Sequence, residues 1–177
     1  MRLFSVGHGT LGEAEFAALL HSAGVVSLVD VRTAPGSRHN PQFGRAEMSR
    51  WLPAHGVAYR WEQELGGFRK PRADSVNTGL RHPAFRGYAD HMATPQFSAA
   101  LSRVLADAAA APSAVMCSES VWWRCHRRLV ADAAALLHGA EVVHLMHDGS
   151  QRAHELTDGA TLRDGAVVYP GNELFDV

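Results

Sequence analysis

The chain has 177 residues, 46% of them hydrophobic, and its 17 basic and 18 acidic residues give a formal net charge of −1. These values fit one globular domain and exclude a disordered chain and a uniformly basic nucleic-acid coat, while 2 cysteines exclude a disulfide framework. No stretch reaches the roughly 18 consecutive apolar residues of a membrane span, and no signal-peptide pattern is visible. We therefore expect a cytoplasmic protein with no membrane partner.

The first half of the chain alternates patterns that are typical of strands and helices. Residues 25–31 are β-branched and nearly continuous, as in a strand that is covered on both faces. Between them and Thr10, apolar residues recur at helical spacing and end at Gly24, a typical helix C-terminus. The predicted elements are a strand at 2–6, a helix at 11–23, a strand at 25–31, a loop at 32–44, a helix at 46–55 and a strand at 57–61.

The second half continues this alternation after a long irregular stretch. Residues 62–83 show no periodicity, and structureless loops of this length are usually functional lids or mobile segments. Thr94 and Pro95 supply an N-cap and a first-turn proline for a long helix. The predicted elements are helices at 84–92, 95–111 and 125–138, strands at 113–117 and 141–146, and a polar extension from about 148 with one short strand at 166–169.

Strands that alternate with helices predict one α/β domain over 1–177. We expect an open, mostly parallel sheet of about five to six strands with helices on both faces, in a Rossmann-like three-layer arrangement. Ligands bind such sheets at the carboxyl ends of the strands. The side chains just beyond four predicted strands should therefore converge, and they are His8, Asp30 with Arg32, Cys117 with Glu119, and His147 with Asp148.

The densest cluster of reactive residue types lies between the strand at 113–117 and the following helix. Cys117, Glu119, Cys125, His126 and Arg127 fall within eleven positions. The N-terminus of a helix is a ready anion site, and a cysteine there has increased thiolate character. The alternative is structural, with the two cysteines as small packing residues.

The same residues also allow a metal site. Cys117, Cys125 and His126 are the candidate ligands, with His8 or Glu119 as a fourth. Zinc sites usually show closer pairs of the Cys-x2-Cys kind, so the spacing is a weak signal.

A second cluster follows the strand at 25–31. Asp30 suits a general base or orients Arg32, while Arg32, Ser37 and Arg38 suit a phosphate or carboxylate. A buried structural Asp30–Arg32 pair is the alternative. His8, between two glycines, suits close approach to a ligand, although a histidine in a turn is more often structural.

Aromatic residues near the arginines suit stacking on a nucleotide base or a single strand, although most such residues are core or rim packing. They are Tyr59, Trp61, Phe68, Phe85, Tyr88, Trp122 and Trp123. The phosphate-binding Gly-Lys-Ser/Thr loop and the nucleophile elbow are missing from the sequence, so the usual NTPase and α/β-hydrolase interpretations lose their main support.

Short motifs occur in order along most of the chain. They are Val6-Gly7-His8, Asp30-Val31-Arg32-x-x-Pro35-x-Ser37-Arg38, Pro41-x-Phe43, Tyr59, Leu65-Gly66-Gly67, Phe85-x-x-Tyr88-x-x-x-Met92, and Met116-Cys117-x-Glu119 with Cys125-His126-Arg127. This series resembles the bacterial domain-of-unknown-function 488 family. The resemblance implies an α/β domain and a site made from these positions, without naming a reaction. Gly9 and Trp122 depart from the pattern, since relatives often have serine and proline there.

We expect an enzyme, a hydrolase or group transferase, that acts on a phosphorylated, nucleotide-like or nucleic-acid substrate. Arg32, Arg38 and Arg127 would bind the anion, Glu119 or Asp30 would be the general base, His126 an acid or second base, and Cys117 or Cys125 the nucleophile. The remaining candidate substrate-binding residues are His8, Ser37, Tyr59, Gly66, Gly67 and Tyr88. This interpretation requires no cofactor, although a metal ion is possible.

Two other classes stay open. The same Cys/His cluster fits a metal-binding or redox thiol protein. A nucleic-acid-binding module is the other, because 32–86 holds ten basic and four acidic residues.

Overall fold

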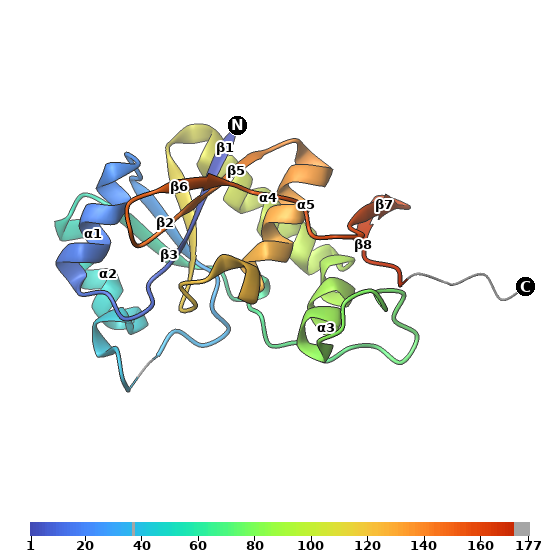
Figure 1. The fold of residues 1–177 in the computed structure, drawn as a ribbon. Helices are drawn as coiled ribbons and strands as arrows, with labels where there is room; N and C mark the ends of the chain where they lie inside the picture. Colours follow the sequence, from blue (N-terminus) through green and yellow to red (C-terminus); the bar gives the residue numbers. More distant parts are fainter. Residues whose placement is uncertain (37, 172–177) are drawn as a thin grey trace, which may run out of the picture.

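The computed structural model describes residues 1–36 and 38–171 (Figure 1). Its centre is a six-stranded sheet in the order β3-β2-β4-β1-β5-β6. Five strands run parallel, and the edge strand β6 pairs antiparallel with β5. The strands are β1 (Arg2–Gly7), β2 (Ser27–Asp30), β3 (Ala58–Trp61), β4 (Ser113–Cys117), β5 (Glu141–Leu145) and β6 (Gln151–Ala153). The predicted α/β architecture is confirmed.

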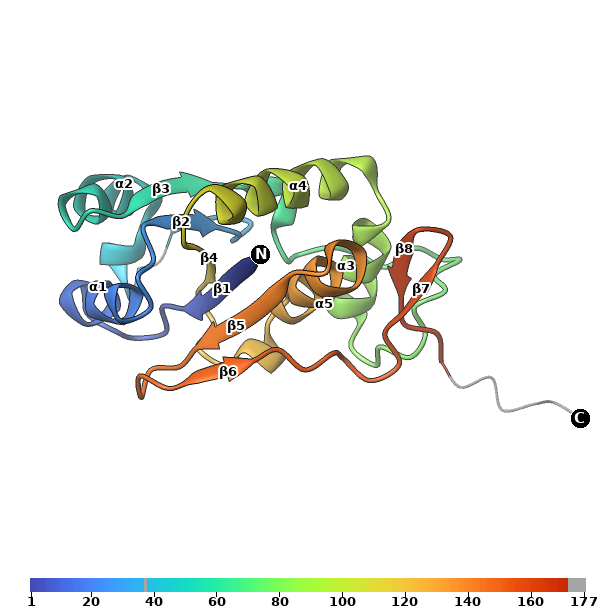
Figure 2. The same cartoon turned by 90° about the horizontal axis from the view of Figure 1, so that it is seen from above.

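Helices cover both faces of the sheet, as Figure 2 shows from above. The chain moves from β1 to β2 and β3 in one direction, with α1 (Glu13–Ser22) and α2 (Arg45–Ala54) on one face. It then reverses to place β4 and β5, and α4 (Pro95–Ala110) and α5 (Arg127–His138) cover the other face. Right-handed crossovers in opposite directions produce this three-layer arrangement.

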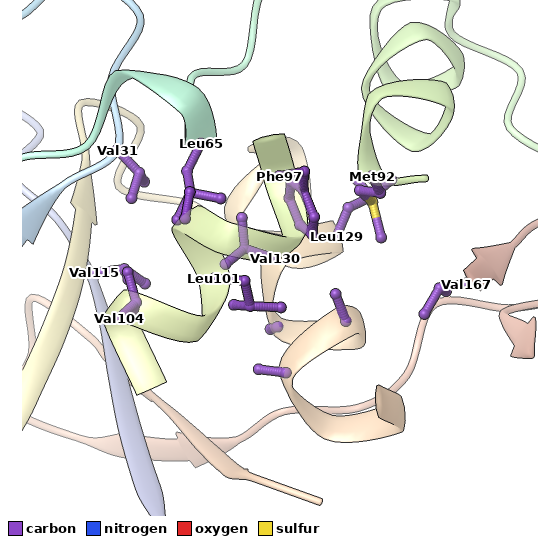
Figure 3. Packing of buried hydrophobic residues seen from close by; sticks show 14 of the residues in the cluster. Val31, Leu65, Met92, Phe97, Leu101, Val104, Val115, Leu129, Val130 and Val167 are labelled. Carbon is purple, nitrogen blue, oxygen red and sulfur yellow. The ribbon is translucent and has the colours of Figure 1, made fainter. Parts of the chain in front are cut away.

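The hydrophobic core is divided between the two faces because successive strand residues point to opposite sides. On β2, Leu28 packs with the layer that contains Phe16 on α1, and Val29 packs with the layer that contains Leu101 on α4. Figure 3 shows this second layer, where Val130 on α5 joins the side chains of α4. The sheet is thereby held rigidly between helices, which fixes the positions of its strand ends.

The irregular segment after β3 is fastened to the domain by polar contacts. It contains one short turn, η2 (Gln63–Leu65), and then passes below α3 (Pro83–Met92). Asp90 on α3 accepts hydrogen bonds from Arg72 N–H, Ser75 Oγ and Asn77 Nδ2 at 2.6–2.8 Å. The segment therefore lacks regular structure, as predicted, but these contacts hold it as a wall rather than as a loose lid.

The C-terminal part contains more strands than the sequence pattern indicated. One short strand is predicted there, whereas the structure has β6 as a sheet edge and a hairpin of β7 (Thr161–Arg163) and β8 (Ala166–Val168). The turn between β7 and β8 places Asp164 and Gly165 at positive φ, 49° and 77°. The hairpin packs against α3 and α5. Within the described residues, no helix has the length and apolar character to span a membrane.

Candidate functional site

The loops after β1, β2 and β4 are joined by backbone hydrogen bonds at the carboxyl edge of the sheet. His8 N–H donates to Cys117 O at 3.0 Å, and Val31 N–H donates to Met116 O at 2.9 Å. Between these loops, the 67–68 turn and α3 lies a cavity of about 870 Å³. Its lining includes His8, Arg32, Cys117, Glu119, Cys125 and His126, so these predicted site residues do converge.

Both cysteines and His126 meet at this cavity. The two Sγ atoms and a ring nitrogen of His126 all lie within 4.8 Å of one another. His126 Nδ1 is 3.6 Å from Cys125 Sγ and 4.0 Å from Cys117 Sγ. Both cysteines are buried and free of disulfide bonding, and both line the cavity.

The two thiols have opposite acidities. The neighbouring Cys117 thiol, assisted by the charge and backbone N–H of Arg127, outweighs burial and lowers the pKa of Cys125 to about 6. The same contact between the thiols, followed by burial, raises the pKa of Cys117 to about 12. Cys125 therefore has the greater thiolate character of the two.

His126 is held with one ring nitrogen toward the thiols. Its Nε2–H donates to Val31 O at 2.9 Å, which leaves the Nδ1 lone pair facing the sulfur atoms. Its ring lies 5.1 Å from the ring of Tyr88, whose hydroxyl donates to Leu65 O. A Cβ at Gly67 would lie 2.5 Å from His126 Nδ1, so only glycine fits over the ring. These contacts account for Gly67 and Tyr88 as predicted site positions.

Asp30 and Arg32 form the buried ion pair that the sequence left as the structural alternative. Asp30 Oδ2 accepts Arg32 Nη2–H at 2.5 Å, and Oδ1 accepts Nε–H at 2.9 Å. The Tyr59 hydroxyl donates to Asp30 Oδ2 at 2.7 Å, and Arg32 Nη2–H also donates to Phe43 O at 2.7 Å. The charges of this pair are thus balanced inside the protein.

His8 is part of the same closed group. Its Nδ1–H donates to Gly9 O at 2.9 Å, so Nε2 accepts Arg32 Nη1–H at 3.2 Å. The ring stacks on Phe43 at 4.1 Å between centroids. Burial lowers the pKa of His8 to about 4, with the charge of Arg32 acting in the same direction. His8 is therefore a neutral acceptor at the cavity wall.

Arg127 is buried and turned away from the cavity, because it fastens β1 to the 118–121 turn. Its Nη1–H donates to Ser5 Oγ at 3.0 Å, and its Nη2–H donates to Glu119 O. Glu119 itself has an exposed carboxylate at the cavity, which accepts Val121 N–H at 3.1 Å. A Cβ at Gly7 would overlap Glu119 O at 1.9 Å, so Gly7 permits this approach.

Arg38, Tyr59 and Gly66 lie outside the cavity lining. Arg38 is exposed, and Ser37 is outside the described residues. Gly66 packs against Thr33, where a Cβ would lie 2.7 Å from Oγ1. Gly66 and Tyr59 therefore shape the loop rather than face the cavity.

Gly9, where the family pattern often has serine, lies close to His147, the first of the two predicted residues after β5. Gly9 has a φ of +52°, and a Cβ there would lie 2.6 Å from His147 Cε1. His147 Nε2–H donates to Gly7 O at 2.7 Å and so holds this turn. Asp148 is exposed and accepts Ser150 hydrogen bonds. Of the two residues that were expected to converge on the site from β5, His147 therefore supports the turn after β1, and Asp148 lies outside the site.

The cavity also contains two residues for which the sequence predicted no role, Arg124 and His82, and three of the aromatic residues that it indicated for stacking. Arg124 and His82 contribute polar groups, and Phe68, Phe85 and Trp123 contribute aromatic faces. Phe68 is 87% exposed and Trp123 is 47% exposed, which is unusual for large apolar side chains. Aromatic residues beside arginines were a signal for these positions, but their exposure depends on loop paths.

The fold and the cavity define an α/β protein with a Cys-Cys-His cluster at the carboxyl edge of a parallel sheet. The family described as Domain of unknown function DUF488 matches residues 13–134. That match spans more than half of the chain, so the protein belongs to this family. Comparison with curated proteins and with solved structures gives no match.

Proposed function

We propose that the protein is an enzyme, a hydrolase or group transferase, with Cys125 as its nucleophile. The observation that supports this proposal is the meeting of both Sγ atoms and His126 Nδ1 within 4.8 Å at a cavity of about 870 Å³. A nucleophile beside a base, with the base oriented by a third group, is the arrangement that covalent catalysis needs. Here the third group is Val31 O.

The substrate that fits this cavity is phosphorylated, nucleotide-like or a nucleic acid. Phe68, Phe85 and Trp123 offer faces on which a base can stack, and Arg124 offers a guanidinium for a phosphate. Arg124 has no ion pair among residues 1–36 and 38–171. The roles expected for Asp30 and Arg32 are not part of this proposal, because they bind each other and the backbone. Arg127 is left out as a substrate contact because it is buried and bonded to Ser5 Oγ and Glu119 O.

The reaction would proceed in two steps. The Cys125 thiolate attacks the electrophilic atom of the substrate, and the bond to the leaving group breaks, so that this group departs with the bonding electrons and takes a proton from water. His126 holds the thiolate in place through Nδ1. Glu119 then removes a proton from water or an acceptor, whose oxygen displaces Cys125 and regenerates the thiolate. The proposal places the protein in the cytoplasm, where reducing conditions keep both cysteines as thiols.

The test is turnover and adduct formation over a panel of nucleotides and intact or modified single-stranded oligonucleotides. Intact-protein mass spectrometry of Glu119→Gln should reveal an accumulating adduct on Cys125, because the second step slows. Cys125→Ala should form none, and Glu13→Gln on the exposed face of α1 should behave as wild type. Turnover that persists in Cys125→Ala, or no turnover and no adduct across the panel, would contradict the proposal.

A metal centre at the same cluster is the second candidate, favoured by the Nδ1 lone pair of His126, which faces both sulfur atoms. Its Nε2–H bond to Val31 O is the kind of outer contact that orients histidine ligands. Cys117, Cys125 and His126 would hold the ion with one position open to the cavity, as in catalytic zinc sites, and the ion would supply Lewis acidity. Stoichiometric zinc, copper or iron in tag-free protein that is lost in Cys125→Ser would support this candidate over the nucleophile.

A further inference from the structure

A second cavity, of about 620 Å³, lies beside the first and shares part of its wall. His82, Phe85 and Trp123 line both cavities. The two cavities therefore adjoin at these three side chains, which we call the partition. A ligand with more than one nucleotide-sized unit can occupy both cavities.

Trp123 of the partition is supported by a series of ring contacts and hydrogen bonds. Trp123 meets the edge of Trp122 at 5.6 Å between centroids, and Trp122 stacks on His144 at 4.1 Å with an angle of 4°. His144 Nε2 is 3.0 Å from His154 Nδ1, and His154 Nε2 is 2.8 Å from Asp132 Oδ1. This chain of contacts keeps Trp123 in place at the surface, although the side chain is 47% exposed. A preorganised, exposed ring is suited to stacking.

An arginine without an anionic partner stands in the second cavity. Arg128, in the first turn of α5, places its guanidinium 5.0 Å from the centroid of Phe85. Its Nε is buried without a hydrogen-bond partner, and none of the ion pairs within residues 1–36 and 38–171 includes it. In contrast, Arg60 and Arg103 are each bonded to carboxylates. A half-buried arginine beside an aromatic ring is suited to a phosphate between two stacked bases.

The remaining charges limit how many phosphates the second cavity can bind. Arg81 is exposed at its rim, and Glu155 and Asp158 also line it. The two carboxylates offset the two arginines, so the cavity has no excess of positive charge. Binding there depends on one phosphate placed at Arg128 and on a planar group at the partition.

We propose that the second cavity binds the neighbouring nucleotide of a single-stranded nucleic acid whose reacting unit occupies the first cavity. Arg128 contacts the phosphate that joins the two nucleotides, and the second base stacks at the partition of Phe85 and Trp123. The inference rests on the proposed function for the occupant of the first cavity. It narrows the substrate class from nucleotides to single strands of at least two units.

The test compares a mononucleotide with a short strand on Cys125→Ala, so that no turnover interferes. Thymidine monophosphate and pentathymidylate are titrated while tryptophan fluorescence is followed. We expect the strand to bind about tenfold more tightly. Arg128→Gln should remove that gain and leave the mononucleotide affinity unchanged. Arg163→Gln on β7, which lines neither cavity, is the matched control, and circular dichroism checks the fold of each variant.

Equal affinity for the two ligands in the parent would overturn the proposal. So would an equal loss for both in Arg128→Gln, or binding of pentaglutamate as tight as that of pentathymidylate, which would assign the cavity to acidic peptides. A failure of Cys125 chemistry is seen separately, because the adduct experiment uses wild-type Cys125 and this titration does not.

Discussion

Two clusters at the same edge of the sheet differ in how completely their polar atoms are bonded. In the first, Asp30, Arg32, His8 and Tyr59 bond to one another and to the backbone, and their charges balance. In the second, Cys117, Cys125 and His126 meet only through long contacts of 3.6 and 4.0 Å between sulfur and Nδ1, and one of the thiols is acidic. Both clusters consist of residue types that perform catalysis, yet only the second has reactive atoms without strong hydrogen-bond partners. We call the first the closed cluster and the second the open cluster.

The contrast follows from the depth of each cluster. Asp30 is fully buried, and an isolated carboxylate there would be very costly without Arg32 as a partner. The Cys117 thiol is weakly polar, and the charge of Arg127 favours the Cys125 thiolate, so both sulfur atoms are buried without full hydrogen bonding. The closed cluster therefore supports the loops, and the open cluster presents its sulfur atoms and imidazole to the cavity, where they can react.

The largest expected effect comes from breaking the closed cluster at its carboxylate. Asp30→Asn leaves the charge of Arg32 buried and uncompensated, so we expect the free energy of unfolding to fall by about 3–5 kcal/mol. Urea denaturation measures this loss. The control is Glu141→Gln, because the Arg2–Glu141 pair is more than half exposed and should contribute less than about 1 kcal/mol. A loss for Asp30→Asn no larger than that of the control would contradict a supporting role.

Acid should weaken the closed cluster through His8. Burial lowers the pKa of His8 to about 4, whereas the unfolded chain has a value near 6.5. The unfolded state thus binds more protons between these values, and the free energy of unfolding falls as pH drops through this window, by about 2–3 kcal/mol. Denaturation at pH 7 and 4.5 measures this loss. His8→Asn should reduce the pH dependence, and an unchanged dependence would refute the assignment.

A methyl group at Gly67 should disturb the open cluster directly. Its Cβ would lie 2.5 Å from His126 Nδ1, so we expect Gly67→Ala to reduce the free energy of unfolding by about 1–3 kcal/mol. The displaced histidine should also slow alkylation of Cys125. Gly36→Ala is the matched control, since its Cβ would meet nothing within 4 Å. Equal behaviour of the two variants would show that His126 does not need this close cover.

The smallest effect is expected at Gly9, which supports both clusters from the β1 loop. Its positive φ makes Gly9→Ser unfavourable by about 1–2 kcal/mol, measured by urea denaturation. Adding His147→Ala removes the steric overlap but not the backbone strain, so part of the loss should remain. Full recovery in the double variant would place the whole cost in the overlap.

Local patterns predicted most of the fold because they act within one element. Thr94 and Pro95 begin α4 as expected, and Gly139 ends α5 with a φ of +62°. Helix boundaries differ from the predicted ones where a neighbouring turn uses the same residues. Helix α5 begins at Arg127 rather than Cys125, because Trp122–Arg124 form a 3₁₀ turn first. The strands after β5 are short and polar, so they show no clear alternation.

The sequence predicted which residues come together at the candidate site, but it did not predict their hydrogen bonds. Strand ends converge by topology, which brought Cys117 toward His126 and His8 toward Arg32. The hydrogen-bond partners of Arg32 and Arg127 include backbone carbonyls of Phe43 and Glu119, whose positions depend on loop paths. Sequence patterns describe side chains and do not specify where such carbonyls point.

The most direct test of the account is the pH dependence of Cys125 alkylation by iodoacetamide, followed by peptide mapping after dialysis against a chelator. We expect a midpoint at about 6 for Cys125, with Cys117 reacting only at far higher pH. Cys117→Ala should shift the Cys125 midpoint upward, and Cys117→Ser, which keeps a donor, should shift it less. A Cys125 midpoint near 9, unaffected by either variant, would contradict the account.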